Sequence, residues 1–414
     1  MKFQDYRIAS EIKQNLEELG FKKPTDIQYK AIPPIIKGED VLAIAQTGTG
    51  KTAAFAIPII DKLHYQKSRY RSQGIKCLIM VPTRELAIQI ESTFHKIGKN
   101  TNLKFFSLYG GVEQDPQIKR LDNGIDVLIT TPGRMFDLVS QGHIDLSTVE
   151  ILVLDEADHM LALGFIRDIQ DVLKFLPKNR QTLFFSATID EHIKDLAYSL
   201  VRKAIRIQIS PDNKVAKNIT HSVAYIEMDD KRFFLERIIK ENPDKKILVF
   251  VRTKVRAERV SAAMDRVDLK TITIHGDKDQ KERSATMRLF REGKYFKVLI
   301  ATDISARGID IEKVDMVVNY DLPDEPENYV HRVGRTGRGE QKGLAVSFCS
   351  EVEKPVLKEI EEYLGKPIQK LEIESKDYEA TIDLTEDPTI QYNPMDLIHE
   401  HEELMAKRKK KKKK

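Results

Sequence analysis

The sequence predicts an α/β protein with two tandem domains, each built on a central parallel sheet. Three observations predict this class. The chain has 414 residues, and about 100–200 residues usually form one domain. Two series of short apolar runs are continuous rather than alternating, which is typical of parallel strands buried on both faces. Stretches with helical spacing, such as 85–98 and 232–242, lie between the runs, and this alternation predicts right-handed βαβ units.

The strand runs fall into two groups with a polar join between them. We predict strands at 41–45, 77–81, 105–109, 126–130, 151–155, 182–186 and 204–209, and then at 247–251, 271–275, 298–302, 316–320 and 344–348. The join, SPDNKVAKN, is polar and contains a proline, which favours a linker. The predicted boundaries are a first domain at 1–209, a linker at 210–218, a second domain at 219–367 and an extension at 368–414.

The extension carries the most uneven charge. Residues 371–406 contain eleven acidic residues and one basic residue, Lys376. Residues 407–414 read KRKKKKKK, and without these eight positive charges the net charge of +4 becomes −4. Bulk charge is therefore no argument that the rest of the chain binds nucleic acid. We expect a largely disordered extension with at most one short helix near 395–408. The basic octet would either hold RNA electrostatically or stay solvated beside the acidic stretch.

Composition argues against several classes of protein. Apolar residues make up 41% and charged residues 32% of the chain, which suits packed cores rather than global disorder. Cys77 and Cys349 are the two cysteines, and both lie in apolar runs, so neither a disulfide framework nor a structural zinc site is expected. No run of 18 apolar residues and no signal-peptide pattern stands in the sequence. We therefore expect a cytoplasmic protein that does not span a membrane.

A phosphate-binding loop is predicted at 45–52, where AQTGTGKT follows the run VLAIA and precedes a helical stretch. Gly48 and Gly50 let backbone N–H groups approach phosphate oxygens, and the N-terminus of the helix adds partial positive charge. Lys51 is expected to reach the β- and γ-phosphates, and Thr52 to bind Mg²⁺ through its hydroxyl. The general pattern begins with glycine, whereas position 45 is alanine.

The second chemical signal is the acidic pair that ends the run ILVLDEAD. Asp155 is expected to hold Mg²⁺, and Glu156 to orient or deprotonate the attacking water. A carboxylate pair at the end of a strand is common and is weak evidence by itself. Together with the phosphate loop about 100 residues upstream, the pair predicts a site that hydrolyses a nucleoside triphosphate.

These motifs resemble those of the DEAD-box family of ATP-dependent RNA helicases. Further motifs stand in the family's order, namely GFKKPTDIQ (20–28), PTRELA (82–87), GG (110–111), TPGR (131–134), SAT (186–188), VFVRT (249–253), HGDKDQKER (275–283), ATDISARGID (301–310) and HRVGRTGR (331–338). The resemblance covers about residues 3–365, and alanine at position 45 is what this family uses. Within the family, the pattern looks most like the bacterial RhlE-type subgroup. The resemblance implies two RecA-like domains that use ATP and Mg²⁺.

The resemblance also implies an adenine pocket near the N-terminus. Gln28 offers an amide donor and acceptor that suit the edge of the base, and Lys23 and Thr25 would complete the pocket. Phe3 would stack on the base, although the residue alone would suggest a place in the core. The other residues implied in nucleotide binding are Gln46, Thr47, Gly48, Thr49, Gly50, Lys51, Thr52 and Asp310.

HRVGRTGR supplies three arginines, each three residues from the next. At the start of a helix these side chains would share one face. By resemblance, Arg335 and Arg338 are arginine fingers for the γ-phosphate, and His331 and Arg332 bridge to the coupling motifs. Such fingers are worth roughly 10³–10⁵ in rate in related systems. Because the phosphate loop is in the first domain and the arginines are in the second, we expect ATP to close the cleft between the domains.

RNA is expected to contact both domains through its backbone and to be told from DNA by its 2′-hydroxyls. The candidates are Pro82, Thr83, Arg84, Gly110, Gly111, Thr131, Pro132, Gly133 and Arg134 in the first domain, and Arg252, Gly276, Gln280, Arg283, Thr302 and Asp303 in the second. Glu85 and Glu282 are expected only to cap helices. By resemblance, Ser186 and Thr188 hydrogen-bond to Asp158 and couple hydrolysis to RNA.

The expected activity is RNA-stimulated ATP hydrolysis with local unwinding of short duplexes. Closure would bend one RNA strand, and hydrolysis would release it. Two other functions stay open, an ATP-gated RNA clamp that does not unwind and a DNA-directed motor of the same superfamily. Intact Glu156, Arg335 and Arg338 argue against a clamp that cannot hydrolyse ATP. The subgroup resemblance suggests ribosomal RNA or pre-ribosomal particles as partners.

Overall fold

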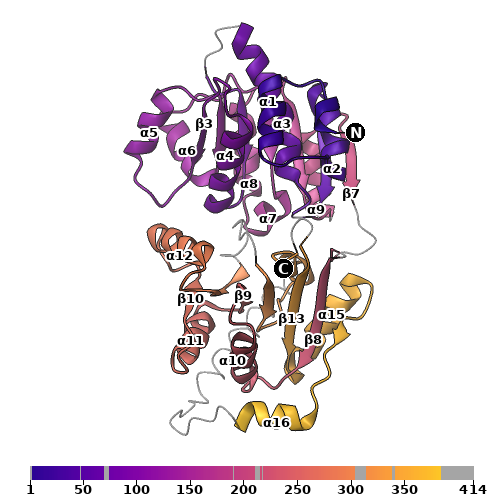
Figure 1. Ribbon diagram of the computed structural model, residues 1–414. Coiled ribbons are helices and arrows are strands. Elements are labelled where there is room, and N and C mark those ends of the chain that lie inside the picture. Colours follow the sequence, from indigo (N-terminus) through magenta and orange to yellow (C-terminus); the bar gives the residue numbers. More distant parts are fainter. Residues whose placement is uncertain are drawn as a thin grey trace. The chain divides into compact units, whose positions relative to one another are not determined.

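The structure is a computed structural model (Figure 1) that describes residues 2–46, 48–69, 74–189, 191–209, 215–216, 218–303, 314–337 and 341–383. It contains two seven-stranded sheets, and all strand pairs in both sheets are parallel. The predicted α/β class with two parallel-sheet domains is therefore confirmed. The helix predicted near 395–408, the basic octet and most of the predicted linker lie outside the described residues.

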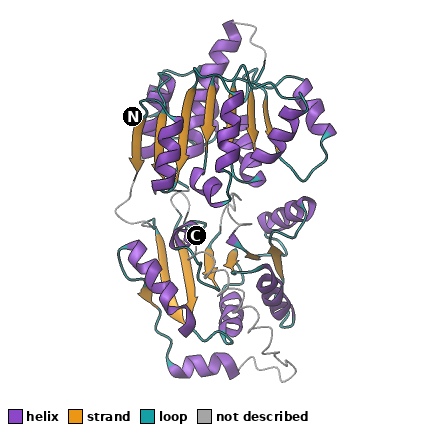
Figure 2. Cartoon of the chain, turned by 180° about the vertical axis from the view of Figure 1, so that it is seen from behind, coloured by secondary structure: helices purple, strands orange, loops and turns teal. Residues whose placement is uncertain are grey.

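The first sheet is flanked by helices on both faces, as Figure 2 shows. Its strands are β1 (Val41–Ala45), β2 (Cys77–Met80), β3 (Phe105–Leu108), β4 (Val127–Thr130), β5 (Ile151–Leu154), β6 (Gln181–Ser186) and β7 (Ile205–Ile209). The accompanying helices are η1 (Phe3–Asp5), α1 (Ser10–Glu18), α2 (Asp26–Ile36), α3 (Lys51–Arg69), α4 (Arg84–Ile97), α5 (Asp115–Asp122), α6 (Pro132–Ser140), α7 (Ala157–Ala162), α8 (Ile166–Phe175) and α9 (Glu191–Leu200).

The second sheet follows in the chain. Its strands are β8 (Ile219–Tyr225), β9 (Ile247–Phe250), β10 (Thr271–Ile274), β11 (Val298–Ala301), β12 (Met316–Asn319), β13 (Gly343–Cys349) and β14 (Gln369–Lys370). The helices of this part are α10 (Lys231–Glu241), α11 (Lys254–Asp265), α12 (Gln280–Glu292), α14 (Pro326–Val333), η2 (Glu351–Glu353) and α15 (Lys354–Leu364).

Two hydrophobic cores explain why the strand sequences are continuously apolar. In β1, Val41, Ala43 and Ala45 belong to the core shared with α1–α4, whereas Leu42 and Ile44 belong to the core shared with α5–α9. Successive side chains of a strand point to opposite faces of its sheet, so both faces of β1 need apolar residues. All five side chains are buried.

The two sheets share one topology. Their strand orders are β3-β4-β2-β5-β6-β1-β7 and β10-β11-β9-β12-β13-β8-β14, so each strand of the first sheet has a counterpart at the same position in the second. This identity supports the interpretation of two related domains. It also places the strand that precedes the phosphate loop, β1, beside β6 and two positions from β5.

Two strands and the position of the helix in the C-terminal extension were not predicted. β8 contains the polar residues His221 and Ser222, so it lacks the continuous apolar run by which the other strands were recognised. β14 has two residues, pairs with β8 and lies beyond the predicted end of the second domain at residue 367. In the acidic stretch, α16 (Ser375–Asp383) forms a helix, upstream of the predicted position near 395–408.

Candidate ATP and RNA site

The predicted ATP motifs follow three neighbouring strands of the first sheet. The loop at 46–50 follows β1, Asp155 and Glu156 follow β5, and Ala187 follows β6. These strands are adjacent in the order β5-β6-β1, and parallel strands end at the same edge. Ligands of open α/β sheets bind at this carboxyl edge. The fold therefore brings together motifs that are separated by about 100 residues in the sequence.

The phosphate loop has the backbone conformation that its glycines allow. Gly48 has a φ of 81° and Gly50 a φ of 94°, values in the left-handed region that favours glycine. Thr49 Oγ1 donates to the carbonyl of Gln46 at 2.7 Å, which closes the turn. Thr47 lies outside the described residues. α3 begins directly after this loop, so its N-terminal N–H groups face the place where a phosphate would bind.

Lys51 is a buried cation with an unsatisfied amine. The residue is 7% exposed, and Nζ has no hydrogen-bond partner within the described part of the chain. A buried ammonium is costly unless it is paired, and buried polar groups without partners are rare in native proteins. A phosphate at the N-terminus of α3 would supply the missing negative oxygens. Lys51 therefore fits the predicted triphosphate.

Asp155 and Glu156 differ in their tendency to ionise. Asp155 is 2% exposed, and its burial raises the pKa to about 6 although the nearby Lys51 charge opposes this. Burial also acts to raise the pKa of Glu156, but the hydrogen bond and charge of His159 and the charge of Lys51 outweigh it and lower the pKa to about 2. The Glu156 Oε2 to His159 Nδ1 distance is 3.4 Å. Glu156 is thus held as a carboxylate, the form that orients water.

Glu156 also has an unusual backbone. Its φ of 52° and ψ of 48° place a non-glycine residue in the left-handed region, at the residue that precedes α7. Such conformations cost of order 1–3 kcal/mol and cluster at functional sites. The Glu156 side chain pairs with His159 in the first turn of α7.

The donor set suits magnesium only in part. Thr52 and Asp155 supply a hydroxyl and a carboxylate, which are oxygen ligands of the kind that Mg²⁺ prefers. Within the described ranges, no group of three or more His, Cys, Asp or Glu residues could hold a metal ion. Mg²⁺ commonly keeps several waters and is shared with substrate phosphates, so two protein ligands are compatible with it.

Gln28 contacts the phosphate loop directly. Its Nε2 donates to the carbonyl of Gly50 at 3.2 Å, and its Oε1 accepts from the backbone N–H of Thr25 at 3.0 Å. The second bond belongs to a capping box at the start of α2. The motif around Gln28 therefore supports the loop in this structure. Lys23 and Thr25 are exposed beside it.

Phe3 lies in the hydrophobic core. It is 2% exposed, and its ring centroid lies 6.1 Å from that of Tyr6 and 5.8 Å from that of Phe21. The prediction that Phe3 stacks on adenine is not supported by this arrangement, because almost no ring surface is accessible. The alternative that the residue alone suggested, a core anchor, describes its position.

Asp158 joins the DEAD segment to the residues after β6. Its Oδ2 accepts from Thr188 Oγ1 at 3.3 Å and from the backbone N–H of Ala187 at 3.2 Å. The predicted bond from Thr188 is therefore present. The bond predicted from Ser186 is absent, since its buried hydroxyl has no partner among the described residues. The second bond to Asp158 comes instead from the N–H of Ala187, the first residue after β6.

The first-domain RNA candidates occupy the other half of the same sheet edge. Pro82–Arg84 follow β2, Gly110 and Gly111 follow β3, and Thr131–Arg134 follow β4, and these strands are adjacent in the order β3-β4-β2. A Cβ added to Gly111 would lie 2.1 Å from Nη1 of Arg84, so these two residues touch. Arg134 Nη2 donates to the carbonyl of Val112 at 2.9 Å. The three motifs therefore form one surface.

Helix caps occupy some motif side chains. Thr83 Oγ1 accepts from the N–H of Leu86 at 3.3 Å and so caps α4. Glu282 accepts from the N–H of Asp279 at 3.1 Å within the capping box of α12, as predicted. Glu85 is not a cap, because its Oε1 forms an ion pair with Nη2 of Arg283 at 2.6 Å.

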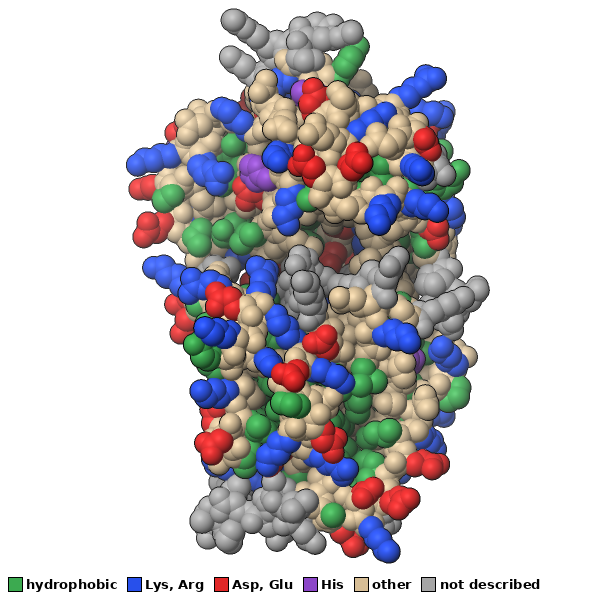
Figure 3. Space-filling model, viewed as in Figure 1, with side chains coloured by type: hydrophobic (Ala, Val, Ile, Leu, Met, Phe, Trp, Pro, Cys, Tyr) green, Lys and Arg blue, Asp and Glu red, His purple; other side chains and the backbone are tan. Residues whose placement is uncertain are grey.

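The second-domain RNA candidates lie at the equivalent half of their own sheet edge. Arg252 follows β9, Gly276 follows β10, and Thr302 and Asp303 follow β11, in the order β10-β11-β9. Figure 3 shows Lys and Arg side chains gathered over α12, the helix that carries Arg283. The side chain of Gln280 lies outside the described residues. Basic side chains beside backbone N–H groups suit phosphate contacts.

Arg332 is a buried structural arginine. It is 2% exposed, and its Nε and Nη2 donate to Asp303 Oδ1 and Oδ2 at 2.6 and 2.7 Å. Nη1 donates to the carbonyl of Asp321 at 2.6 Å. The bridge from Arg332 to the coupling motifs stays a prediction, because this guanidinium donates to Asp303 and Asp321. The Asp303 carboxylate is occupied by the bidentate pair. Hydrogen bonds in such bidentate arginine–carboxylate pairs are roughly twice as strong as those between neutral groups.

HRVGRTGR lies at the end of a helix rather than at its start. α14 ends at Val333, with Gly334 as its C-cap, so Arg332 is helical and Arg335 is not. The prediction that the arginines share one helical face is therefore wrong. Arg335 is 5% exposed, and its Nε donates to the carbonyl of His331 at 3.3 Å. Arg338 and Asp310 lie outside the described residues.

A cavity of about 330 Å³ adjoins the phosphate loop. Thr25, Gln46, Gly48 and Thr49 line it, together with Gly334 and Thr336 from the HRVGRTGR region. Pockets for small ligands span roughly 300–1,000 Å³. The cavity therefore has the size and the location for part of a nucleotide.

Comparison with known proteins identifies the family. The model of the DEAD/DEAH box helicase family matches residues 25–196, and that of the helicase conserved C-terminal domain matches residues 230–340. The ATP-dependent RNA helicase RhlB of Shewanella sediminis is 41% identical over 387 residues, which cover 92% of this chain and 88% of that protein. This chain belongs to the DEAD-box helicase family. The ATP-dependent RNA helicase DbpA of Bacillus subtilis is 38% identical, over 91% of this chain and 77% of that protein.

Solved structures of the DEAD-box family have the same fold. The structure of S. cerevisiae Dbp5 bound to RNA and ADP BeF3 matches with a TM-score of 0.81 and 29% identity, over 93% of this chain and all of that one. Mss116 bound to ssRNA and UDP-BeF matches with a TM-score of 0.81 and 28% identity, over 93% and 82%. The similar proteins carry several names, so the RhlE-type subgroup stays a prediction. In the part of the chain that is described, no helix is long and apolar enough to cross a membrane.

Proposed function

We propose that this protein is an ATP-dependent RNA helicase whose ATP hydrolysis is stimulated by RNA. The observation that carries the proposal is one edge of the first sheet, where the buried Lys51 lies beside Asp155 and Glu156 and its Nζ has no hydrogen-bond partner among the described residues. The RNA candidates Arg84 and Arg134 lie on the other half of this edge. Membership of the DEAD-box family and the printed activities of the relatives support the same function.

In the proposed site, the protein binds ATP together with Mg²⁺. The loop at 46–52 would hold the phosphates, with Lys51 on the β- and γ-phosphates. Thr52 and Asp155 would hold Mg²⁺, which neutralises charge on the phosphates when it is bound. Glu156, kept as a carboxylate, would orient the attacking water. Gln28 would read adenine while its amide stays in contact with Gly50.

The two domains would work together because neither holds the whole site. The phosphate loop belongs to the first domain, whereas Arg335 and Arg338 belong to the second. ATP would favour the arrangement in which these arginines reach the γ-phosphate, since it gains contacts only there. RNA bound across both domains would be bent on closure and lose a few base pairs. Hydrolysis would remove the γ-phosphate, the closed arrangement would lose its advantage, and RNA would leave.

RNA would be held through its backbone and without sequence specificity. The candidate residues offer arginines, hydroxyls and backbone N–H groups, which contact phosphate and sugar rather than base edges. Asp303 would contact RNA through its backbone or at a hydroxyl rather than at a phosphate, because its carboxylate is negative and pairs with Arg332. We further propose a cytoplasmic location, with ribosomal RNA or pre-ribosomal particles as the target.

The test is unwinding of a short RNA duplex, with ATP hydrolysis measured in parallel. We expect unwinding to need ATP, and Lys51→Ala to abolish both activities while the fold survives. Lys174→Ala, an exposed change on α8 of the same domain, is the matched control and should behave as the unchanged protein. RNA-stimulated hydrolysis without unwinding would favour an ATP-gated clamp. Equal stimulation by DNA would favour a DNA-directed motor, and a normal ATPase rate in Lys51→Ala would refute the phosphate-loop assignment.

A further inference from the structure

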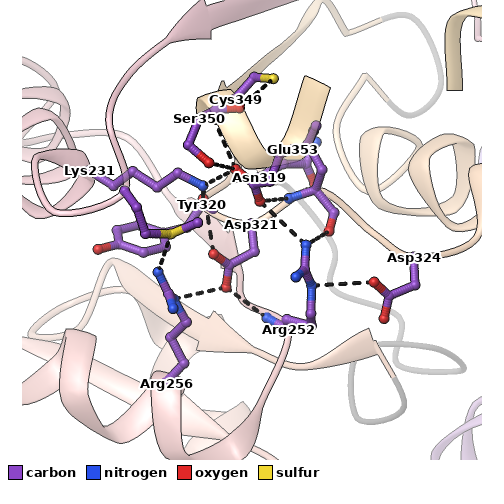
Figure 4. Close-up of polar contacts among 12 residues, drawn as sticks. Lys231, Arg252, Arg256, Asn319, Tyr320, Asp321, Asp324, Cys349, Ser350 and Glu353 are labelled. Carbon is purple, nitrogen blue, oxygen red and sulfur yellow. Dashed lines mark hydrogen bonds and ion pairs between the residues drawn. The ribbon is translucent and has the colours of Figure 1, made fainter. Parts of the chain in front are cut away.

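A buried cluster of charged residues lies in the second domain, at the carboxyl ends of β9 and β12 (Figure 4). At its centre is Lys231, the first residue of α10, which is 0% exposed. Its Nζ donates to Glu353 Oε2 at 2.5 Å and to the carbonyl of Tyr320 at 2.8 Å. Asp321 Oδ1 is 3.7 Å away. Neither Lys231 nor Glu353 belongs to a motif with a role in the proposed function.

Glu353 is the acceptor that joins the cluster together. It is 2% exposed, and its Oε2 also accepts from the N–H and the hydroxyl of Ser350 at 3.0 and 2.9 Å. Its Oε1 accepts from the N–H of Leu322 at 3.2 Å and from Arg252 Nη2 at 3.4 Å. One carboxylate thereby fixes the start of α15, the loop after β12 and the arginine after β9.

The charges of the cluster balance only as a group. Asp321 is the second buried carboxylate, and it accepts from the backbone N–H of Arg252 at 3.0 Å and pairs with Arg256 Nε at 3.2 Å. Buried ion pairs contribute little net stability because desolvation offsets their attraction. A cluster of this size is therefore better explained by the geometry that it imposes than by the stability that it adds.

Arg252 is the member of the cluster that reaches the surface. Its side chain is 21% exposed. Nη2 donates to the carbonyl of Leu322 at 3.1 Å as well as to Glu353, and Nε lies 3.4 Å from Asp324 on the rim. Nη1 makes no hydrogen bond to the described residues. The guanidinium is thus held along one side and presents its remaining nitrogen outward.

We propose that Glu353 is a positioning residue for RNA binding, which holds the Arg252 guanidinium in the orientation that contacts an RNA phosphate. Lys231 holds Glu353 at Oε2, the oxygen that does not contact Arg252, and compensates the negative charge of the buried carboxylate. This inference rests on the proposed function, because it assigns RNA as the ligand of Arg252. An arginine that is already held loses less conformational entropy when it binds RNA than a mobile arginine does. Ordering one long side chain on binding lowers the affinity about three- to tenfold.

The test uses a variant in which both buried charges are removed together, Lys231→Met with Glu353→Gln. The pair keeps the interior neutral, and the amide still accepts hydrogen bonds from the backbone, so the fold is expected to survive. We expect the KM for single-stranded RNA in the ATPase assay to rise about three- to tenfold. The kcat at saturating RNA and the KM for ATP should stay within about twofold. Glu362→Gln, an exposed change on α15, is the matched control and should alter none of these values.

A cycle with Arg252→Ala shows whether Glu353 acts through that arginine. Arg252→Ala should raise the KM for RNA at least as much as the double variant Lys231→Met with Glu353→Gln does. When all three substitutions are combined, the KM should rise no further. A further multiplicative rise, an unchanged KM in the pair, or a parallel fall in kcat would overturn the proposal. If the double variant does not fold, Arg252→Lys tests the same point. Lysine keeps the positive charge, but its single amine cannot contact Glu353 and Asp324 in the way that Nη2 and Nε of the arginine do. Arg252→Lys should raise the KM for RNA about threefold, and an unchanged KM would overturn the proposal.

The outcomes separate this inference from the proposed function. If hydrolysis by the unchanged protein is stimulated by RNA but Arg252→Ala has a normal KM for RNA, the positioning role is overturned and the helicase function stands. If RNA does not stimulate the unchanged protein at all, the proposed function fails, and the positioning role fails with it.

Discussion

Replacing Gly50 by alanine tests whether Gln28 and the phosphate loop act as one unit. Gly50 has a φ of 94°, so any L-residue at this position is strained. A Cβ built there would lie 2.4 Å from Gln28 Nε2 and 3.1 Å from Thr25 Oγ1. Gln28 would have to move, and its bond to the carbonyl of Gly50 would be lost.

Gly142 provides the control from which the magnitude follows. It has a φ of 79°, and a Cβ there would meet nothing within 4 Å. Gly142→Ala should therefore destabilise the protein by the backbone strain alone, about 1–2 kcal/mol. Gly50→Ala should add the loss of the Gln28 bond, about 1 kcal/mol more. Because the loop is the phosphate site, we also expect ATP affinity to fall about tenfold or more in Gly50→Ala only.

The assay combines urea unfolding with ATP binding by calorimetry for the two alanine variants. The stability difference between the variants isolates the Gln28 contact, and the affinity difference isolates its effect on the loop. Equal ATP affinities in Gly50→Ala and Gly142→Ala would refute the reasoning. So would an unchanged affinity in Gly50→Ala, since Gln28 would then not support the nucleotide site.

Three further predictions concern the acid, the coupling residue and the buried cluster. Glu156→Gln removes a carboxylate whose pKa is lowered to about 2, so hydrolysis should fall about 10²–10⁴-fold while ATP still binds and RNA is held more tightly with ATP than without. Equal RNA affinity with and without ATP, measured by filter binding, would contradict this. Thr188→Val removes the 3.3 Å bond to Asp158, worth about 1 kcal/mol, so unwinding should fall about fivefold more than RNA-stimulated hydrolysis; a parallel loss would show that the bond does not couple the two. Burial acts to raise the pKa of Asp321, but the charges of Arg256, Lys231 and Arg252 outweigh it and lower that pKa, so its stabilisation is present above the unfolded pKa of about 3.9 and is lost as pH falls through the folded pKa. Asp321→Asn should therefore lower the free energy of unfolding by about 3–5 kcal/mol at pH 7 and by progressively less below about pH 4. An equal loss at pH 7 and below about pH 4, measured by urea unfolding, would contradict the charge assignment.

The strands and ATP motifs were predictable because each carries a local signal. β1 serves two cores at once, so VLAIA is apolar at every position and is recognised as a buried parallel strand. The phosphate loop needs glycines at Gly48 and Gly50 for their positive φ values, and this requirement is visible in the sequence. β8 escaped detection because its polar residues break the apolar run, and β14 is too short to leave a pattern.

The parts that were missed depend on residues far apart in the chain. Lys231 and Glu353 are separated by 122 positions, and alone each would be taken for a solvated residue at the start of a helix. The burial of Phe3 and the pairing of Arg332 with Asp303 depend in the same way on how elements pack. Strand order was equally hidden, although it decides that the ATP motifs share one half of the sheet edge and the RNA candidates the other.

The central claim is that RNA and ATP act on one coupled site, and the most direct test is the rate of ATP hydrolysis under three conditions. The rate is measured without nucleic acid, with single-stranded RNA and with single-stranded DNA of the same sequence. The account predicts strong stimulation by RNA and little by DNA, and loss of the stimulated rate in Lys51→Ala. No stimulation by RNA would contradict it, and the RNA-binding role of the motifs from Arg84 to Asp303 would then have to be abandoned.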